Sequence, residues 1–197
     1  MGITRLNALG TSRIYSTYIG GDGNDLPLSM MADGQSNLVI MGRTTSANFP
    51  GTLIGSGGGG DVCVLKLNPT GTALIGSLRI GGDGLDAANV EIQRPVGPIR
   101  EVSTLRFYGD DSRGEVILDG SNNIYVATQS QSDNFPMKNA LQGIRKGGQD
   151  GVIMKIDPNC SGLIFSTYLG GSKDDGVFVM DISPTTGNLY IADGGNN

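Results

Sequence analysis

The chain has 197 residues and contains neither histidine nor tryptophan. Without histidine it can form no Ser-His-Asp or Cys-His catalytic group, and it offers no imidazole ligand to a metal ion. Charged residues make up only 17% of the sequence, a low share for a globular domain. Many common classes of enzyme are therefore excluded.

Clusters of basic residues and long apolar runs are also missing. The formal net charge is -5 and the sequence pI is about 4.6. An acidic chain without a basic cluster is a poor ligand for nucleic acid or anionic membranes. No apolar run reaches the length of about 18 residues that a membrane span needs, and the N-terminal MGITRLNALG lacks the apolar core of a signal peptide. We expect neither nucleic-acid binding nor membrane insertion.

There are only two cysteines. Cys63 lies in a predicted strand, DVCVLKL, and Cys160 lies in a turn, DPNCSG. We expect two free thiols, one of them buried in the core. A mutual disulfide is the alternative, since spacing alone does not decide the pairing.

The sequence repeats one motif three times. The copies are RLNALGTSRIYSTYIGG at 5–21, KLNPTGTALIGSLRIGG at 66–82 and KIDPNCSGLIFSTYLGG at 155–171. A second spacing also occurs twice within the chain. It runs from an Asp-Gly pair to a Phe-Pro pair, over 33–50 and 119–136. Repeats of this length indicate a repeat architecture.

Short segments rich in Ile, Val, Leu and Tyr, bounded by turn residues, predict strands. No long segment has a helical period, so we expect almost no helix. The predicted strands cover about 3–7, 12–19, 26–32, 37–44, 61–68, 73–80, 114–119, 123–130, 150–157, 163–169, 176–183 and 187–192.

Several of these strands are continuous apolar runs, among them LVIM at 38–41, VIM at 152–154 and VFVM at 177–180. Such runs are typical of strands in a sheet that is covered on both faces. We therefore predict an all-β fold of β-propeller blades, each of four antiparallel strands, and prefer it to a β-helix or a two-sheet sandwich. The Gly-Gly pairs should cross between blades, using positive φ and close backbone approach.

The register predicts a single β-propeller region over 1–197. It divides into a partial blade at 3–21, a blade at 22–82, a blade at 83–171 and a partial blade at 172–197. These amount to about three blades, whereas known propellers close with about four to eight. Either the chain is part of a larger propeller, or copies of it associate by completing each other's blades.

The motifs STYIGG, STYLGG, GGGGD, K-[LI]-[ND]-P and the Asn/Asp-Phe-Pro step resemble the SBBP-type β-propeller repeat of bacterial surface proteins. SNNIYVATQSQSDNFP and SPTTGNLYIADGG are similar to versions found in large Bacteroidetes proteins. The resemblance implies an extracellular or outer cell-surface location, often reached by type IX secretion. It implies as partners the other domains of a larger surface protein, other protein chains or glycans.

Three loops carry acidic residues after Gly-Gly, and two of them match the GGxGxD start of calcium-binding β-roll repeats. Carboxylates and backbone carbonyls are the ligands that Ca²⁺ prefers, so an isolated calcium ion is one interpretation. The alternative is a turn in which Asp caps backbone N–H groups. No other cofactor is expected. The candidate residues are Asp22, Asp25, Asp83, Asp86, Asp174 and Asp175.

An insertion of about 25 residues near 91–115 interrupts the third unit, and VSTLRFY within it could form an additional strand. Insertions in repeat proteins often carry binding contacts, although a decorative loop is the alternative. The candidate ligand-binding residues in this insertion are Arg106, Tyr108, Asp110 and Asp111.

Other recurring positions predict structural roles. Lys66, Lys155 and Arg5 should be solvated or paired with acids on neighbouring strands. Tyr18 and Tyr168, like Phe49 and Phe135, should pack within blades, with sugar stacking at Phe-Pro as the alternative.

The sequence thus favours a non-catalytic extracellular scaffold for surface display, adhesion or protein association. A glycan- or calcium-binding module is the second hypothesis. A propeller glycosidase or lyase is the third hypothesis. It ranks last because adjacent acids such as Asp110 and Asp111 do not provide the defined carboxylate separation that glycoside hydrolysis requires.

Overall fold

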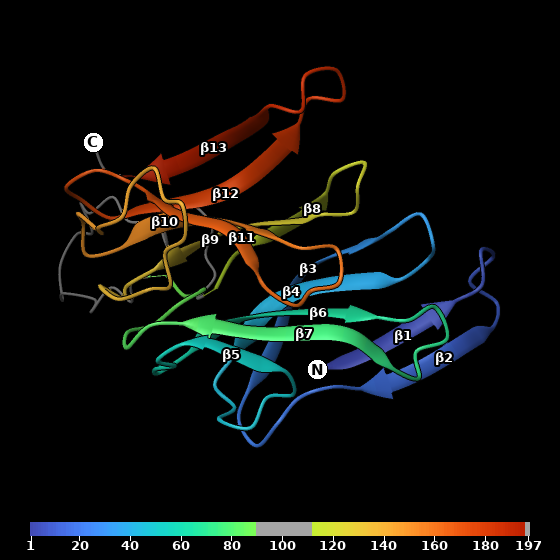
Figure 1. Cartoon of the computed structure of the whole chain (residues 1–197). Coiled ribbons are helices and arrows are strands. Elements are labelled where there is room, and N and C mark those ends of the chain that lie inside the picture. Colours follow the sequence, from blue (N-terminus) through green and yellow to red (C-terminus); the bar gives the residue numbers. More distant parts are fainter. Residues whose placement is uncertain (90–111, 196–197) are drawn as a thin grey trace, which may run out of the picture.

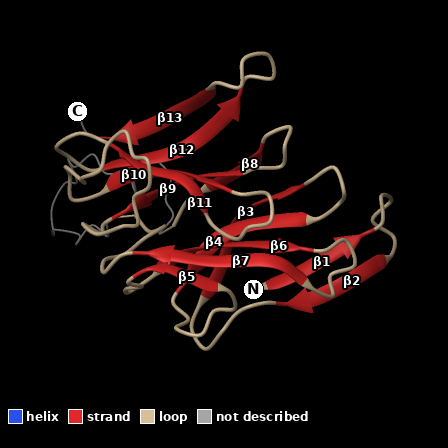
Figure 2. Cartoon of the chain, viewed as in Figure 1, coloured by secondary structure: helices blue, strands red, loops and turns tan. Residues whose placement is uncertain are grey.

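The computed structural model describes residues 1–89 and 112–195. This part of the chain consists of strands, turns and loops without a helix, as Figure 2 shows, so the all-β prediction is confirmed and no membrane-spanning helix is found there. The strands are β1 (Gly2–Leu6), β2 (Arg13–Tyr18), β3 (Asp25–Ala32), β4 (Leu38–Thr44), β5 (Thr52–Gly55), β6 (Asp61–Leu67), β7 (Leu74–Gly81), β8 (Glu115–Leu118), β9 (Ile124–Ser130), β10 (Asp150–Ile156), β11 (Leu163–Leu169), β12 (Asp175–Ile182) and β13 (Leu189–Gly195).

The strands form four sheets, which follow the chain from the N-terminal to the C-terminal end (Figure 1). The N-terminal sheet is β1-β2, and the C-terminal sheet is β12-β13. Between them lie the second sheet, in the order β3-β4-β6-β7-β5, and the third sheet, in the order β8-β9-β10-β11. All the predicted strands outside the insertion are present.

One strand, β5, was missed by the sequence analysis. It pairs in parallel with β7, whereas every other named strand pair is antiparallel. It begins directly after Gly51 and ends at Gly55, and these two glycines have φ values of 125° and 100°. A four-residue segment flanked by glycines carries little periodicity, and its pairing with β7 depends on tertiary structure.

The three copies of the repeated motif form the same hairpin. The pairs β1-β2, β6-β7 and β10-β11 share one antiparallel register and one irregularity near the end of the first strand. In each, an Asn or Asp side chain accepts a backbone N–H four residues later, at 2.9 Å for Asn7 and Thr11, 2.9 Å for Asn68 and Thr72 and 3.2 Å for Asp157 and Ser161. This turn explains why each copy has Asn or Asp after the apolar residue.

Apolar side chains pack between successive sheets in three clusters. The largest joins the second and third sheets and includes Val64 and Val126. The second joins the N-terminal and second sheets through Ile3 and Leu65, and the third joins the third and C-terminal sheets through Ile153 and Met180. The two inner sheets are therefore covered on both faces, as their continuous apolar runs predicted.

At the C-terminal sheet this prediction is wrong in part. Val179, in the VFVM run, is 54% exposed. The side chains of β12 that face the third sheet are buried, such as Val177 and Met180. Within residues 1–89 and 112–195 no further sheet covers the other face of β12, so an apolar run in this strand does not mean burial on both sides.

The predictions for the cysteines and for the recurring aromatic residues were largely confirmed. Both cysteines are free and buried. Phe49, Phe135 and Tyr168 are buried, but Tyr18 is 88% exposed, so its predicted packing is wrong. Tyr168 packs near Phe135 and donates a hydrogen bond to the Ser132 carbonyl.

Candidate functional site

Three Gly-Gly loops, each leading into the following sheet, hold the predicted acidic residues of the chain. In each loop an Asp lies four residues after the second glycine and accepts its backbone N–H. The distances are 2.9 Å for Gly21 and Asp25, 2.9 Å for Gly82 and Asp86, and 2.6 Å for Gly171 and Asp175. The capping role, given above as the alternative to calcium, is therefore present at all three loops.

In the first loop, hydroxyl groups from the end of β4 complete the shell around Asp25. Thr44 Oγ1 donates to Asp25 Oδ1 at 2.6 Å, and Ser46 Oγ lies 3.0 and 3.1 Å from the two carboxylate oxygens. Burial by itself raises the pKa of Asp25, but the hydrogen bonds from Thr44, Gly21 and Ser46 outweigh it and leave the pKa below its usual value.

The second loop repeats this arrangement around Asp86. Ser130 and Ser132, from the end of β9, donate to its carboxylate in the places of Thr44 and Ser46. Asp86 is fully buried, and this burial raises its pKa to about 6 despite the three donors, with the Asp61 charge adding to the rise.

The first glycine of each pair allows a close approach of carboxylates. A Cβ atom on Gly81 would lie 1.9 Å from Asp61 Oδ1 and 2.8 Å from Asp86 Oδ2, and one on Gly20 would lie 2.2 Å from Asp25 Oδ2. None of the six glycines in the three pairs has a positive φ. The predicted close approach is confirmed, and the predicted positive φ is wrong.

The third loop differs from the first two at the first of the two hydroxyl positions. Gly195 pairs with Asp175 as Thr44 pairs with Asp25, so no side-chain hydroxyl stands at that position. The position that matches Ser46, two residues further on, lies outside the described residues. Burial raises the pKa of Asp175, and the nearby charges of Asp150, Asp193 and Asp174 add to the rise.

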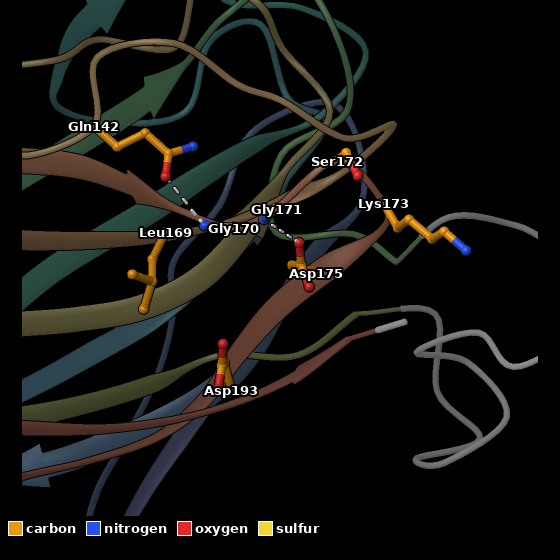
Figure 3. Close-up of a pocket in the computed structure, with 8 residues that line it drawn as sticks. All are labelled: Gln142, Leu169, Gly170, Gly171, Ser172, Lys173, Asp175 and Asp193. Atoms are coloured by element: carbon orange, nitrogen blue, oxygen red, sulfur yellow. Dashed lines mark hydrogen bonds between the residues drawn. The ribbon is translucent and has the colours of Figure 1, made fainter. Parts of the chain in front are cut away.

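A pocket of about 390 Å³ lies beside the third loop (Figure 3). Gly170 N–H donates to the Gln142 side chain at 3.3 Å on one side of it, and Asp175 and Asp193 stand on the other. The pocket is lined by Gln142, Leu169, Gly170, Gly171, Ser172, Lys173, Asp175 and Asp193.

The first two loops share one more contact. The side chains of Asn48 and Asn134 accept the backbone N–H of the residue that follows Gly-Gly.

The remaining calcium candidates do not gather into one site. Asp83 accepts a hydrogen bond from Ser56, which lowers its pKa, and Asp22 is exposed. Asp174 lies beside Gly148. Within residues 1–89 and 112–195, no group of three or more His, Cys, Asp or Glu side chains could hold a metal ion. Calcium binding stays a prediction.

The candidate ligand-binding residues of the insertion, Arg106, Tyr108, Asp110 and Asp111, lie outside the described residues, as does the possible strand VSTLRFY. The structure therefore does not test them.

The recurring basic residues have acidic or carbonyl partners. Lys66 forms an ion pair with Asp33 at 2.9 Å, and Lys155 forms one with Asp119 at 3.4 Å. Arg5 instead donates to the Pro69 carbonyl at 2.8 Å. The expected pairing with acids is thus confirmed for the two lysines.

Sequence reasoning missed the hydroxyl partners of Asp25 and Asp86, although a signal for them exists. TTSANFP at 44–50 and SQSDNFP at 130–136 share the pattern hydroxyl-x-hydroxyl-x-Asn-Phe-Pro. The two hydroxyl residues bind the carboxylate, and the Asn caps the Gly-Gly loop. Comparison with protein-family models and with curated proteins gives no match for this chain.

Proposed function

We propose that the chain forms β-propeller blades and acts as a non-catalytic scaffold on the outer surface of a bacterium. The observation that carries this proposal is the repeated sheet. Strands β3-β4-β6-β7 and β8-β9-β10-β11 have the same antiparallel order, and both sheets are packed on two neighbours. Four-stranded sheets that pack face to face around an axis are the blades of a propeller.

The use of the carboxylates supports a scaffold over a glycosidase. Asp25 and Asp86 each accept three hydrogen-bond donors from the chain itself, and Asp61 is paired with Arg79. The same contacts recur in successive loops, whereas an active site needs only one copy of its residues. Carboxylates held in this way stabilise loops between sheets.

The surface location and the partners rest on the resemblance of the repeated motifs to SBBP-type repeats. The scaffold would hold other domains of a larger surface protein, or other protein chains, at fixed positions. Repeat architectures suit this role because each unit contacts mainly its neighbours and presents loops at regular intervals.

Labelling of intact cells tests the proposal. Antibodies against the purified chain should label intact cells of the native bacterium as strongly as permeabilised ones, and added protease should remove the signal. Labelling that requires permeabilisation would contradict the surface location. Specific binding of the purified chain on a glycan array would favour the glycan-binding hypothesis instead.

A further inference from the structure

Two strands of the structure have an unpaired edge at equivalent places in the repeat. In the part of the chain that the structure describes, β13 pairs only with β12, and β1 pairs only with β2. In the second sheet, the strands at these positions, β4 and β6, pair with each other, and so do β9 and β10 in the third sheet. The C-terminal and N-terminal sheets are therefore the first and second halves of one four-stranded sheet.

The two complete sheets define the register in which these halves would join. Leu38 lies opposite Leu67 in the second sheet, and Ile124 lies opposite Ile156 in the third. The irregularity shared by the three hairpins aligns Leu6 with Leu67 and Ile156. Both sheets then give one set of pairs between β13 and β1: Leu189 with Leu6, Tyr190 with Arg5, Ile191 with Thr4, Ala192 with Ile3, and Asp193 with Gly2.

The side chains at this seam are exposed where their equivalents are buried. Ile191 is 36% exposed, whereas Ile40 at the same position is 2% exposed. Tyr190 is 61% exposed, whereas Tyr125 is 7% exposed. An exposed strand edge with apolar side chains is a template for pairing with another strand.

The seam also brings a basic residue opposite an aromatic ring. In the third sheet, Lys155 lies opposite Tyr125, and its ammonium group is 4.8 Å from the centre of the tyrosine ring. The proposed register places Arg5 opposite Tyr190, so the same cation–π contact would form. The chain thus carries both halves of the contact, one at each of its ends.

We propose that the edge of β13 in one copy of this chain pairs with the edge of β1 in a second copy. Figure 1 shows β13 and β1 at opposite ends of the series of sheets, so one copy does not close on itself. Each copy supplies one complementary edge at each end, which makes the contact heterologous, and such contacts close into a ring only at a suitable copy number.

For assemblies built from the 197-residue chain alone, the number of sheets in its described residues predicts the copy number. Two copies would hold four complete sheets and two composite ones, a total of six, within the range of about four to eight blades of known propellers. A single copy gives three, and three copies give nine, both outside that range. The closed dimer rests on the proposed propeller architecture, whereas the pairing of β13 with β1 rests on the register alone.

Light scattering after size-exclusion chromatography tests the assembly on the 197-residue chain. We expect a mass of twice 20.4 kDa at micromolar concentration. A mass of 20.4 kDa at all concentrations would overturn the proposal. A continuous series of larger species would overturn the closed dimer.

Cysteine cross-linking tests the register. Residues directly opposite each other in antiparallel strands have Cα atoms roughly 4.5–5.5 Å apart, which a disulfide can bridge. We expect Thr4→Cys mixed with Ile191→Cys to give a covalent dimer on mild oxidation, and each variant alone to give none. Both positions are exposed, and the native cysteines are buried.

Two controls make the cross-linking decisive. Thr4→Cys mixed with Ala192→Cys is shifted by one residue, which turns the side chains to opposite faces, and should not cross-link. Equal cross-linking in both mixtures would overturn the register. A monomeric chain that is still labelled on intact cells would overturn the pairing and leave the proposed scaffold function standing.

Discussion

Two ion pairs at equivalent positions of the repeat differ sharply in burial. The side chains of Lys66 and Asp33 are 6% and 0% exposed, with 2.9 Å between nitrogen and oxygen. Those of Lys155 and Asp119 are 22% and 17% exposed, and the distance is 3.4 Å. Replacing each lysine by methionine therefore compares a buried pair with a partly exposed one at equivalent positions of the repeat.

We expect Lys66→Met to lower the free energy of unfolding by about 3 kcal/mol, at the low end of the range for breaking a buried pair. Burial alone raises the pKa of Asp33, but Asn37, Lys66 and Gln35 together lower it to about 2. The change from its usual 3.8 corresponds to about 2.5 kcal/mol in favour of the carboxylate at neutral pH. Asn37 and Gln35 still donate in the variant, whereas the Pro158 carbonyl loses the Lys66 donor.

Urea unfolding followed by circular dichroism at pH 7 measures the effect. The control Lys155→Met should cost about 1 kcal/mol or less, as for exposed pairs. Because the folded-state pKa of Asp33 is lowered, its contribution is complete above its unfolded-state value and is lost as the pH falls from 3.8 toward 2. Equal losses for the two lysine variants at pH 7 would refute the argument from burial.

Four other predictions follow from the loops and the core. Because the pKa of Asp86 is raised to about 6, its contribution to stability should be complete below pH 3.8 and be lost as the pH rises to about 6, and Asp86→Asn should remove this slope in urea titrations at pH 4–7. Gly81→Ala should cost about 1–3 kcal/mol or more because its Cβ meets carboxylates, whereas Gly34→Ala, with open space around it, should cost under about 1 kcal/mol in the same assay. Burial raises the pKa of Cys63 and Cys160 to about 12, so both thiols should react with a thiol reagent at pH 8 only after denaturation. Since hydrogen-bond donors already occupy the loop carboxylates, Ca²⁺ and a chelator should give the same melting temperature, and a rise with Ca²⁺ would support the calcium hypothesis.

The strands were predictable because their signals are local. Short apolar segments between Asp-Gly, Asn-Pro and Gly-Gly turns identified all the described strands except β5. The parallel pairing of β5 with β7 brings together residues 26 positions apart, such as Thr52 and Leu78, and nothing within β5 encodes it. Strand existence was thus readable in the sequence, and the extra pairing was not.

The loop site was predictable only in part. The sequence identified Asp25 and Asp86 and offered capping as one of two roles. Their hydroxyl partners come from the ends of β4 and β9, which the antiparallel register of β3-β4 and an isolated bridge from Asp86 to Ser130 bring into contact. Carboxylates attract both metal ions and N–H or O–H donors, so the partners had to be located before the role could be assigned.

The sequence by itself determined the repeat, the all-β fold and the places where Gly-Gly must stand. Tertiary structure decided which copies of a motif are enclosed. STY at 16–18 and STY at 166–168 are identical, yet Tyr18 is 88% exposed and Tyr168 is fully buried. Tyr168 lies against Phe135 and the loop at Ser132 within a complete sheet, whereas β2 belongs to a sheet of two strands. Burial depends on the neighbours that a side chain acquires in space, and those neighbours lie in other segments of the chain.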